Sequence, residues 1–138
     1  MLAFKPQFVV LMLGTNDTNK KSWPDYHDQF AADYESLIDD LRKADPAVQI
    51  WLCTPPPLFR DRGLAWDTDA ILKDEIIPQI KELAKQNNCK LIDAYSLFAD
   101  KAAQFPDGVH PNAAGAAVLA AAVERELAPR LAKTPEKK

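Results

Sequence analysis

Apolar residues gather in three short blocks along the chain, and these blocks predict three β-strands. The first block, 8–13, runs through six apolar residues without a polar break, which is typical of a parallel strand covered by helices on both faces. The second, 48–54, is rich in branched and aromatic residues, and the prolines at 55–57 forbid its continuation. The third block is 89–93. A parallel sheet is therefore expected.

Between and after these blocks, apolar residues recur at spacings of three and four, which predicts amphipathic helices. Asn112 is expected to cap the last helix. Pro78 lies inside the second and removes a backbone donor, so we expect a kink there or two short helices. A shorter helical segment is expected around 96–101. The first long helix is expected to begin at an entrance over 22–25 and to end near 44, with Phe30, Tyr34, Leu37, Ile38 and Leu41 buried. The other two, with the residues expected to be buried, are 67–88 (Ile71 or Leu72, Ile76, Ile80, Leu83, Ala84) and 112–131 (Ala116, Leu119, Val123, Leu127).

The alternation of strands and helices predicts a single α/β domain. With a parallel sheet, this order gives a three-layer α/β/α sandwich. Right-handed crossovers place the first two long helices on one face of the sheet and the last helix on the other. We expect the domain to cover residues 1–132 and the charged tail 133–138 to be disordered.

Charge and cysteine content narrow the class of partner. A formal net charge of -3 and a pI near 5.3 offer no broad attraction to phosphate backbones, so nucleic acid is not an expected partner. No apolar run approaches the roughly 20 residues of a membrane span, and no signal peptide is recognisable. Cys53 and Cys89 fall at opposite ends of their strands, so we expect two free thiols.

Two polar clusters are the candidates for chemistry, because ligands bind beyond the carboxyl ends of parallel strands. In the first, 14–17, the side-chain amide of Asn16 could donate to a developing oxyanion, with Gly14 and Thr15 lining the substrate site. The alternative is a plain β-turn, since glycine, asparagine and aspartate supply its usual backbone conformations.

The second cluster, 105–112, holds Asp107 and His110 on either side of a glycine. In a tight turn the carboxylate can reach Nδ1 of the imidazole, which leaves Nε2 to accept a proton. The alternative is that Asp107 closes a turn and His110 caps a helix. His27, the other histidine, is interpreted as a solvated surface residue.

Four further side chains fall in loops at the expected crevice. Trp23 and Trp66 could stack on the face of a sugar, although packing of the loops onto the domain is the alternative. Arg60 and Arg62 could meet an acidic substrate, and a solvated loop explains them equally well.

Together, Gly14-Thr15-Asn16-Asp17 after a strand and Asp107-Gly108-Val109-His110-Pro111-Asn112 before the final helix resemble the SGNH, or GDSL-type, family of serine hydrolases. The resemblance covers essentially the whole chain and is greatest to the carbohydrate O-acetylesterase branch, including sialate O-acetylesterase-like proteins. It implies a flavodoxin-like sheet and hydrolysis of acetyl or short acyl esters, acetylated sugars included, without metal or cofactor. It also implies Asn16 as oxyanion donor, Asp107 as orienting acid and His110 as general base.

One departure from the family is large. The family carries its nucleophilic serine in a Gly-Asp-Ser motif, at the end of a strand that precedes the segments matched in this chain. This serine has no counterpart here, because Ser22, Ser36 and Ser96 do not follow Gly-Asp. The chain therefore resembles the C-terminal part of such a domain. The strand beginning at Phe8 would then have an unpaired edge, and we expect it to pair with a second copy or with a complementing N-terminal segment.

A second interpretation is a catalytically silent α/β module that binds a ligand or partner chain. The absent nucleophile favours it, whereas the presence of Asn16, Asp107 and His110 together favours the hydrolase. Flavodoxin-like nucleotide binding is disfavoured because no glycine-rich phosphate loop follows a strand.

Overall fold

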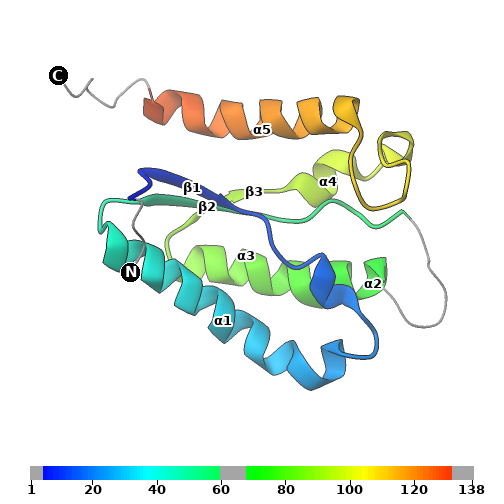
Figure 1. The fold of residues 1–138 in the computed structure, drawn as a ribbon, viewed down its shortest axis with the longest axis horizontal. Helices are drawn as coiled ribbons and strands as arrows, with labels where there is room; N and C mark the ends of the chain where they lie inside the picture. Colours follow the sequence, from blue (N-terminus) through cyan, green and yellow to red (C-terminus); the bar gives the residue numbers. More distant parts are fainter. Residues whose placement is uncertain (1–4, 60–67, 132–138) are drawn as a thin grey trace.

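The computed structural model describes residues 5–59 and 68–131, and the tail 133–138 and the residues 60–67 lie outside this part. Strands and helices alternate along the described chain as the sequence predicts (Figure 1). The strands are β1 (Phe8–Leu11), β2 (Gln49–Cys53) and β3 (Lys90–Ile92); the helices are α1 (Trp23–Ala44), α2 (Asp69–Ile71), α3 (Ile77–Gln86), α4 (Ala94–Phe98) and α5 (Ala113–Leu131), with 3-10 turns η1 (Asn16–Thr18) and η3 (Ala102–Gln104) and a π-helical turn η2 (Leu72–Ile76).

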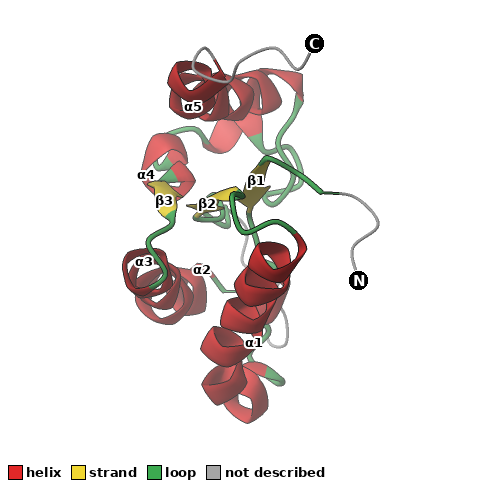
Figure 2. Cartoon of the chain, turned by 90° about the vertical axis from the view of Figure 1, so that its left-hand side faces the viewer, coloured by secondary structure: helices red, strands yellow, loops and turns green. Residues whose placement is uncertain are grey.

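The described strands form one parallel sheet in the order β1-β2-β3. Val9 is in register with Ile50, and Leu52 with Leu91. Helices α1 and α3 cover one face of the sheet, and α5 covers the other (Figures 1 and 2). The three-layer sandwich and the placement of the helices by right-handed crossovers are thereby confirmed.

Two apolar cores lie on the two faces of β2, whose side chains alternate between them. Ile50 and Leu52 pack with α1 and α3, while Trp51 and Cys53 pack with α4 and α5. All four are at most 5% exposed. The continuous apolar block of β2 is thus explained by burial on both faces, as expected for a central parallel strand.

The first strand departs from its prediction. It ends at Leu11, and Met12 and Leu13 are 41% and 45% exposed. β1 lies at the edge of the described sheet, so no described strand pairs with its outer edge. Its four residues are accordingly only half-buried. The turn at Gly14, with φ at +116°, then leads the chain away from the sheet.

The helix around Pro78 is interrupted, as predicted. The amide of Ile77 donates to the carbonyl of Leu72, five residues back, which makes η2 a π-helical turn between α2 and α3. Pro78 follows in the first turn of α3, where its missing N–H costs least. Further on, α4 begins at Ala94 rather than near 96, because the Asp93 side chain accepts from the Ser96 amide and caps the helix.

The expected burial of the helices holds with two corrections. Leu37 on α1 is 37% exposed, and Ala116 on α5 is exposed, while Gly115 and Ala122 are the buried positions of that helix. Gly115 is buried because it packs against Pro111 and Gln104, whose nearest atoms an added Cβ would meet at 2.9 and 3.3 Å. Cys53 and Cys89 are both free thiols, as expected. No helix in the described part is long and apolar enough to cross a membrane.

Candidate active site

The turn between α4 and α5 holds its aspartate and histidine as the sequence predicts. Asp107 Oδ2 lies 2.7 Å from His110 Nδ1, and Asp107 Oδ1 accepts from the amides of Val109 (2.9 Å) and His110 (2.7 Å). Gly108 sits between them with φ at +79°, in the left-handed region that other residues avoid. The turn therefore forms because glycine permits it and the carboxylate closes it.

The charge of Asp107 fixes the proton on the imidazole. The ring of His110, followed by the backbone amides of His110 and Val109, holds the pKa of Asp107 well below its ordinary value. The ionised carboxylate can only accept, so Nδ1 donates to it. The His110 side chain is 79% exposed, and no described residue hydrogen bonds to Nε2. That nitrogen can therefore take a proton from a neighbouring group.

This electrostatic coupling gives a testable titration. The depressed pKa of Asp107 means that its stabilising contribution is complete above pH 3.8 and is lost as pH falls toward its lower folded value. In His110→Ala, the Asp107 midpoint followed by carboxyl ¹³C NMR should rise, while remaining below 3.8 because both backbone amides still donate. The midpoint of Asp100, whose pKa is lowered by Lys101 instead, should not change. An unmoved Asp107 midpoint would contradict the coupling.

The turn is anchored on both sides by hydrogen bonds from other segments. Phe59, in the segment that leaves β2, donates its amide to the carbonyl of Gly108 at 2.9 Å. Asn112 donates its amide to the carbonyl of Gln104 and caps α5, as predicted, by accepting from the Gly115 amide at 3.0 Å. His110 thus sits on a fixed loop rather than on a free one. The contribution of Phe59 has no signal in the sequence, because it is made by the backbone.

Asn16 is held at the end of β1 by a compact turn. It is the first residue of η1, in which the hydroxyl of the fully buried Thr18 donates to the Thr15 carbonyl at 2.7 Å and the Asp17 amide donates to the Gly14 carbonyl. Asn16 itself is exposed. Figure 1 shows η1 and the loop before α5 at the same end of the sheet, beyond the carboxyl ends of the strands. The predicted roles of Asn16 and His110 both require this arrangement.

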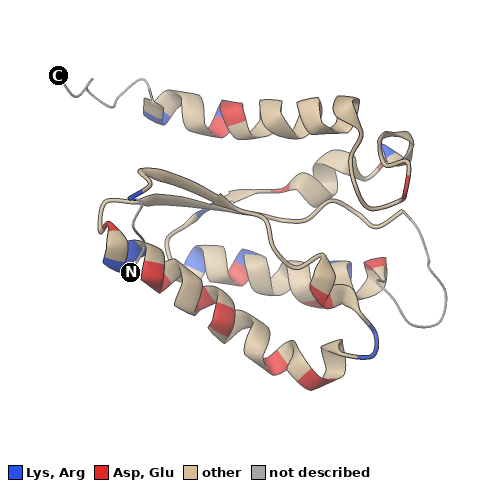
Figure 3. Cartoon of the chain, in the orientation of Figure 1, with Lys and Arg blue, Asp and Glu red and all other residues tan. Residues whose placement is uncertain are grey.

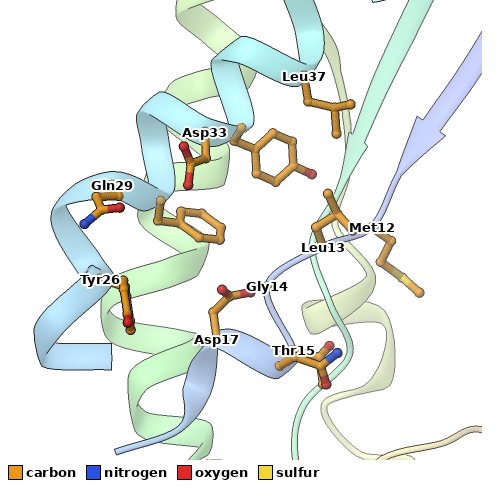
Figure 4. Close-up of a pocket in the computed structure, with 12 residues that line it drawn as sticks. Met12, Leu13, Gly14, Thr15, Asp17, Tyr26, Gln29, Asp33 and Leu37 are labelled. Atoms are coloured by element: carbon orange, nitrogen blue, oxygen red, sulfur yellow. The ribbon is translucent and has the colours of Figure 1, made fainter. Parts of the chain in front are cut away.

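A cavity of about 440 Å³ opens between the end of β1 and the helix α1. Gly14, Thr15, Asn16 and Asp17 line it from the strand side, and Tyr26, Gln29 and Asp33 line it from α1 (Figure 4). Asp107 and His110 are not among its lining residues. Burial raises the pKa of Asp17 at its wall. The cavity therefore shares Asn16 with the candidate site but is separate from the histidine.

Acidic residues follow one another along α1 (Figure 3), which forms the outer wall of this cavity. Its basic residues, Arg42 and Lys43, lie in its last turn, where they suit the helix dipole. Of the acidic residues of α1 only Asp33 lines the cavity, together with Asp17 from the strand side, and two carboxyl groups in the lining disfavour an anionic ligand. Among the described residues, no group of histidine, cysteine, aspartate and glutamate side chains is arranged to hold a metal ion.

The structure corrects one predicted site residue, Trp23. The residue is not in a crevice loop but begins α1, where it is 4% exposed. Its indole Nε1 donates to Glu75 Oε2 at 2.6 Å, and its ring packs edge-on against Phe30. Because both the ring face and the polar edge have partners, Trp23 is not available to stack on a sugar. Trp66, Arg60 and Arg62 lie outside the described residues.

The other candidate side chains are accounted for locally. His27 pairs with Asp28 at 3.0 Å on the surface of α1, in agreement with its interpretation as a surface residue. Ser96 donates to Asp93 at the start of α4. Ser22 precedes α1 without capping it, and Ser36 is exposed on that helix. No serine in the described part of the chain hydrogen bonds to His110.

The parallel sheet between two helical layers is a three-layer α/β fold, and the aspartate-held histidine lies beyond the carboxyl ends of its strands, where such folds bind ligands. The chain belongs to the GDSL-like lipase/acylhydrolase family, whose sequence model matches residues 1–118. Membership of this family of ester hydrolases confirms the resemblance seen in the two polar clusters.

Several relatives are carbohydrate esterases. The chain is 39% identical over 140 residues to an acetylxylan esterase of Xylanibacter ruminicola, covering 86% of this chain and 28% of that protein. It is 30% identical to an acetylxylan esterase of Geobacillus stearothermophilus, covering 92% and 62% of the respective lengths. The chain thus spans less than two thirds of either relative.

Solved structures agree on the fold. An acetyl-xylooligosaccharide esterase from Geobacillus superposes with a TM-score of 0.69 and 28% identity, over 89% of this chain and 60% of that one. A carbohydrate esterase of family 3 from Talaromyces cellulolyticus, at 23% identity and a TM-score of 0.73, covers 95% and 61% and is similar in fold.

Proposed function

We propose that this chain supplies the acid–base and oxyanion-binding part of a serine esterase that removes acetyl or short acyl groups, including those on carbohydrate. The observation that carries the proposal is the 2.7 Å contact between ionised Asp107 and His110 Nδ1, with the exposed ring at the carboxyl end of the sheet. The acetyl and carbohydrate preference is supported by the relatives named as acetylxylan esterases.

The proposed reaction proceeds in two halves. In the first, a serine hydroxyl attacks the acyl carbonyl while His110 Nε2 takes the hydroxyl proton, and the Asn16 amide donates to the resulting oxyanion. Collapse breaks the ester bond, and His110 returns the proton to the leaving alcohol. In the second half, His110 takes a proton from water, which attacks the acyl-serine, and then gives that proton back to the serine as the acid is released.

The serine of this mechanism is proposed to come from a strand that pairs with the outer edge of β1. That edge has no partner within the described sheet, and the apolar residues beside it, Met12, Leu13 and Leu37, are 37–45% exposed. A parallel strand added there would end next to the turn that begins at Gly14. A serine just beyond its end would then lie beside Asn16.

The exposed edge leads to a prediction about the chain alone. We expect it to self-associate at micromolar concentrations, because an unpaired strand flanked by apolar side chains is a template for pairing. In sedimentation velocity, Leu13→Glu should shift the chain toward monomer by placing a charge at the contact. Leu131→Glu is the matched control, since Leu131 is 56% exposed on α5, the helix that covers the opposite face of the sheet from α1, and is not among the residues that line the cavity beside Leu13. A wild-type chain that sediments as a monomer, with β1 amides protected from exchange, would contradict the prediction.

The experiment that tests the function joins this chain to the portion of the Geobacillus stearothermophilus relative that it does not cover. We expect the joined protein to hydrolyse an aryl acetate and to release acetate from acetylated xylo-oligosaccharides, and the chain alone to stay at the background rate. A joined protein that folds but hydrolyses neither substrate would overturn the esterase proposal and favour the binding module.

A further inference from the structure

One carboxylate outside the candidate site ties two segments of the fold together. Asp69, the first residue of α2, accepts a hydrogen bond from the Tyr95 hydroxyl at 2.6 Å through Oδ2. Through Oδ1 it accepts from the backbone amide of Leu58 at 2.8 Å. Asp69 thus links the start of α2, the segment leaving β2, and α4.

The bridged segment is the one that holds the histidine turn. Leu58 is 7% exposed, and the next residue, Phe59, donates its amide to the carbonyl of Gly108 at 2.9 Å. The Phe59 ring also lies 5.1 Å from the ring of Phe105 at the start of the turn. A displacement of the Leu58 backbone would therefore move the donor that fixes the peptide between Asp107 and His110.

We propose that Asp69 and Tyr95 are positioning residues for His110, acting through the backbone of Leu58 and Phe59 on the Gly108 carbonyl. The inference that this positioning serves ester hydrolysis rests on the proposed function. The effect of Asp69 and Tyr95 on the geometry of the turn does not rest on the proposed function. The positioning and the esterase activity can therefore be tested separately.

The bridge has the features of a rigid support. Burial, and then the Asp69 carboxylate, raise the pKa of Tyr95, so its hydroxyl stays a donor at neutral pH. The Tyr95 amide donates to Oγ1 of the fully buried Thr54 at 3.0 Å. Three prolines occupy 55–57 between Thr54 and Leu58 and remove much of the backbone freedom of this segment. The segment 54–58 is consequently held at one end by the hydrogen bond to Thr54 and at the other by the hydrogen bond from Leu58 to Asp69.

The Thr54 end of the segment is secured by a second carboxylate. The Thr54 hydroxyl donates to Asp93 Oδ1 at 3.2 Å, and Lys81 pairs with Asp93 Oδ2 at 3.0 Å. Burial alone would raise the pKa of Asp93, but hydrogen bonds from the Ser96 amide and from Lys81 lower it. Ionised at neutral pH, Asp93 is a strong acceptor. Asp69 secures the other end, the one nearest the turn.

Positioning of this kind matters for a general base, because a misplacement of about 1 Å can cost roughly a hundredfold in rate. The exposed ring of His110 has no packing of its own to fix it. Its place therefore depends on the turn, and the turn depends on Phe59 and Asp107. Removing the Asp69 bridge should loosen the turn without touching either catalytic candidate.

The test measures hydrogen exchange of the Phe59 amide and the titration of Asp107 by NMR in four variants. Asp69→Ala should speed Phe59 exchange by about tenfold, as expected for loss of a hydrogen bond to a charged group, and raise the Asp107 midpoint. In Asp69→Asn, the exchange rate of the Phe59 amide and the Asp107 midpoint should both stay close to their wild-type values, since the side-chain amide can accept from Leu58 and donate to the Tyr95 oxygen. Tyr95→Phe should have a smaller effect, because the bond to Leu58 remains. Asp39→Ala, the same change at an exposed position of α1, should resemble wild type.

Two results would overturn the proposal. One is Phe59 exchange that is no faster in Asp69→Ala than in Asp39→Ala; the other is an equal acceleration of exchange at Leu52 in the core, which would show general destabilisation. If Asp69→Ala does not fold, Tyr95→Phe decides in the same way. In the joined protein, Asp69→Ala should lower kcat with KM unchanged, and Asp69→Asn should recover it. A joined protein inactive in every variant, the parent included, would count against the esterase and leave the exchange result to decide the positioning.

Discussion

Replacing His110 by alanine is expected to lower kcat of the joined protein toward an aryl acetate by about 10²–10⁴-fold, the usual contribution of a positioned general base. The loss should fall on kcat rather than KM, because the imidazole acts on a proton in transit and adds little to ground-state binding. Asp107 would remain in place, held by the backbone amides of Val109 and residue 110. Steady-state kinetics at neutral pH measures both constants.

The chain offers a matched control in its second histidine. His27 is partly exposed and pairs with an aspartate, as His110 does, but lies on the surface of α1. His27→Ala should therefore leave kcat within a factor of about two, as expected for a surface substitution away from the reaction. If both substitutions reduced kcat equally, His110 would have no role as the base, and the Asp107 contact would be only the closure of a turn.

Much of the fold could be predicted because its signals are local. The branched and aromatic residues of β2, which the prolines at 55–57 end, and the three-and-four spacing of apolar residues in α1 identify these two elements from local sequence. Asn112 and Pro78 mark a cap and an interruption through their own chemistry. The contact between Asp107 and His110 was predictable for the same reason, since three residues separate the partners and Gly108 permits the turn.

The errors arise where burial depends on distant segments. Trp23 follows a polar loop in the sequence, yet its ring is buried because Phe30 and Glu75 meet it from α1 and η2. Met12 continues an apolar block, yet it is exposed because β1 has no described neighbour on its outer side. Hydrophobicity alone does not reveal whether a partner is present.

The bridge at Asp69 was missed for a related reason. Its partners lie 11 and 26 residues away, and one of them is a backbone amide that any residue but proline could supply. In the sequence Asp69 only stands near the start of a predicted helix, and the cap there is made by the Thr68 hydroxyl, which accepts from the Ile71 amide. A side chain that acts by hydrogen bonding to a backbone amide is thus not recognisable from the residue types around the site that it supports.

Asn16→Ala is the second substitution with a large expected effect. In the joined protein it should lower kcat by about 10²–10³-fold, the usual loss when one donor to an oxyanion is removed. KM should change little, because the donor is most effective once negative charge develops on the carbonyl oxygen. Thermal unfolding should be nearly unaffected, since Asn16 is exposed and no described group hydrogen bonds to its side chain.

Asn19→Ala provides the comparison for this substitution. Asn19 follows η1 directly, and its side chain accepts only from the Lys21 amide among the described residues. It should leave kcat unchanged, so that a specific loss at residue 16 assigns the amide to the reaction. Asn16→Asp should be at least as damaging as the alanine variant, because a carboxylate would repel the oxyanion that the amide stabilises. Full activity in Asn16→Asp would show that the oxyanion is bound elsewhere and that the turn after β1 serves the fold alone.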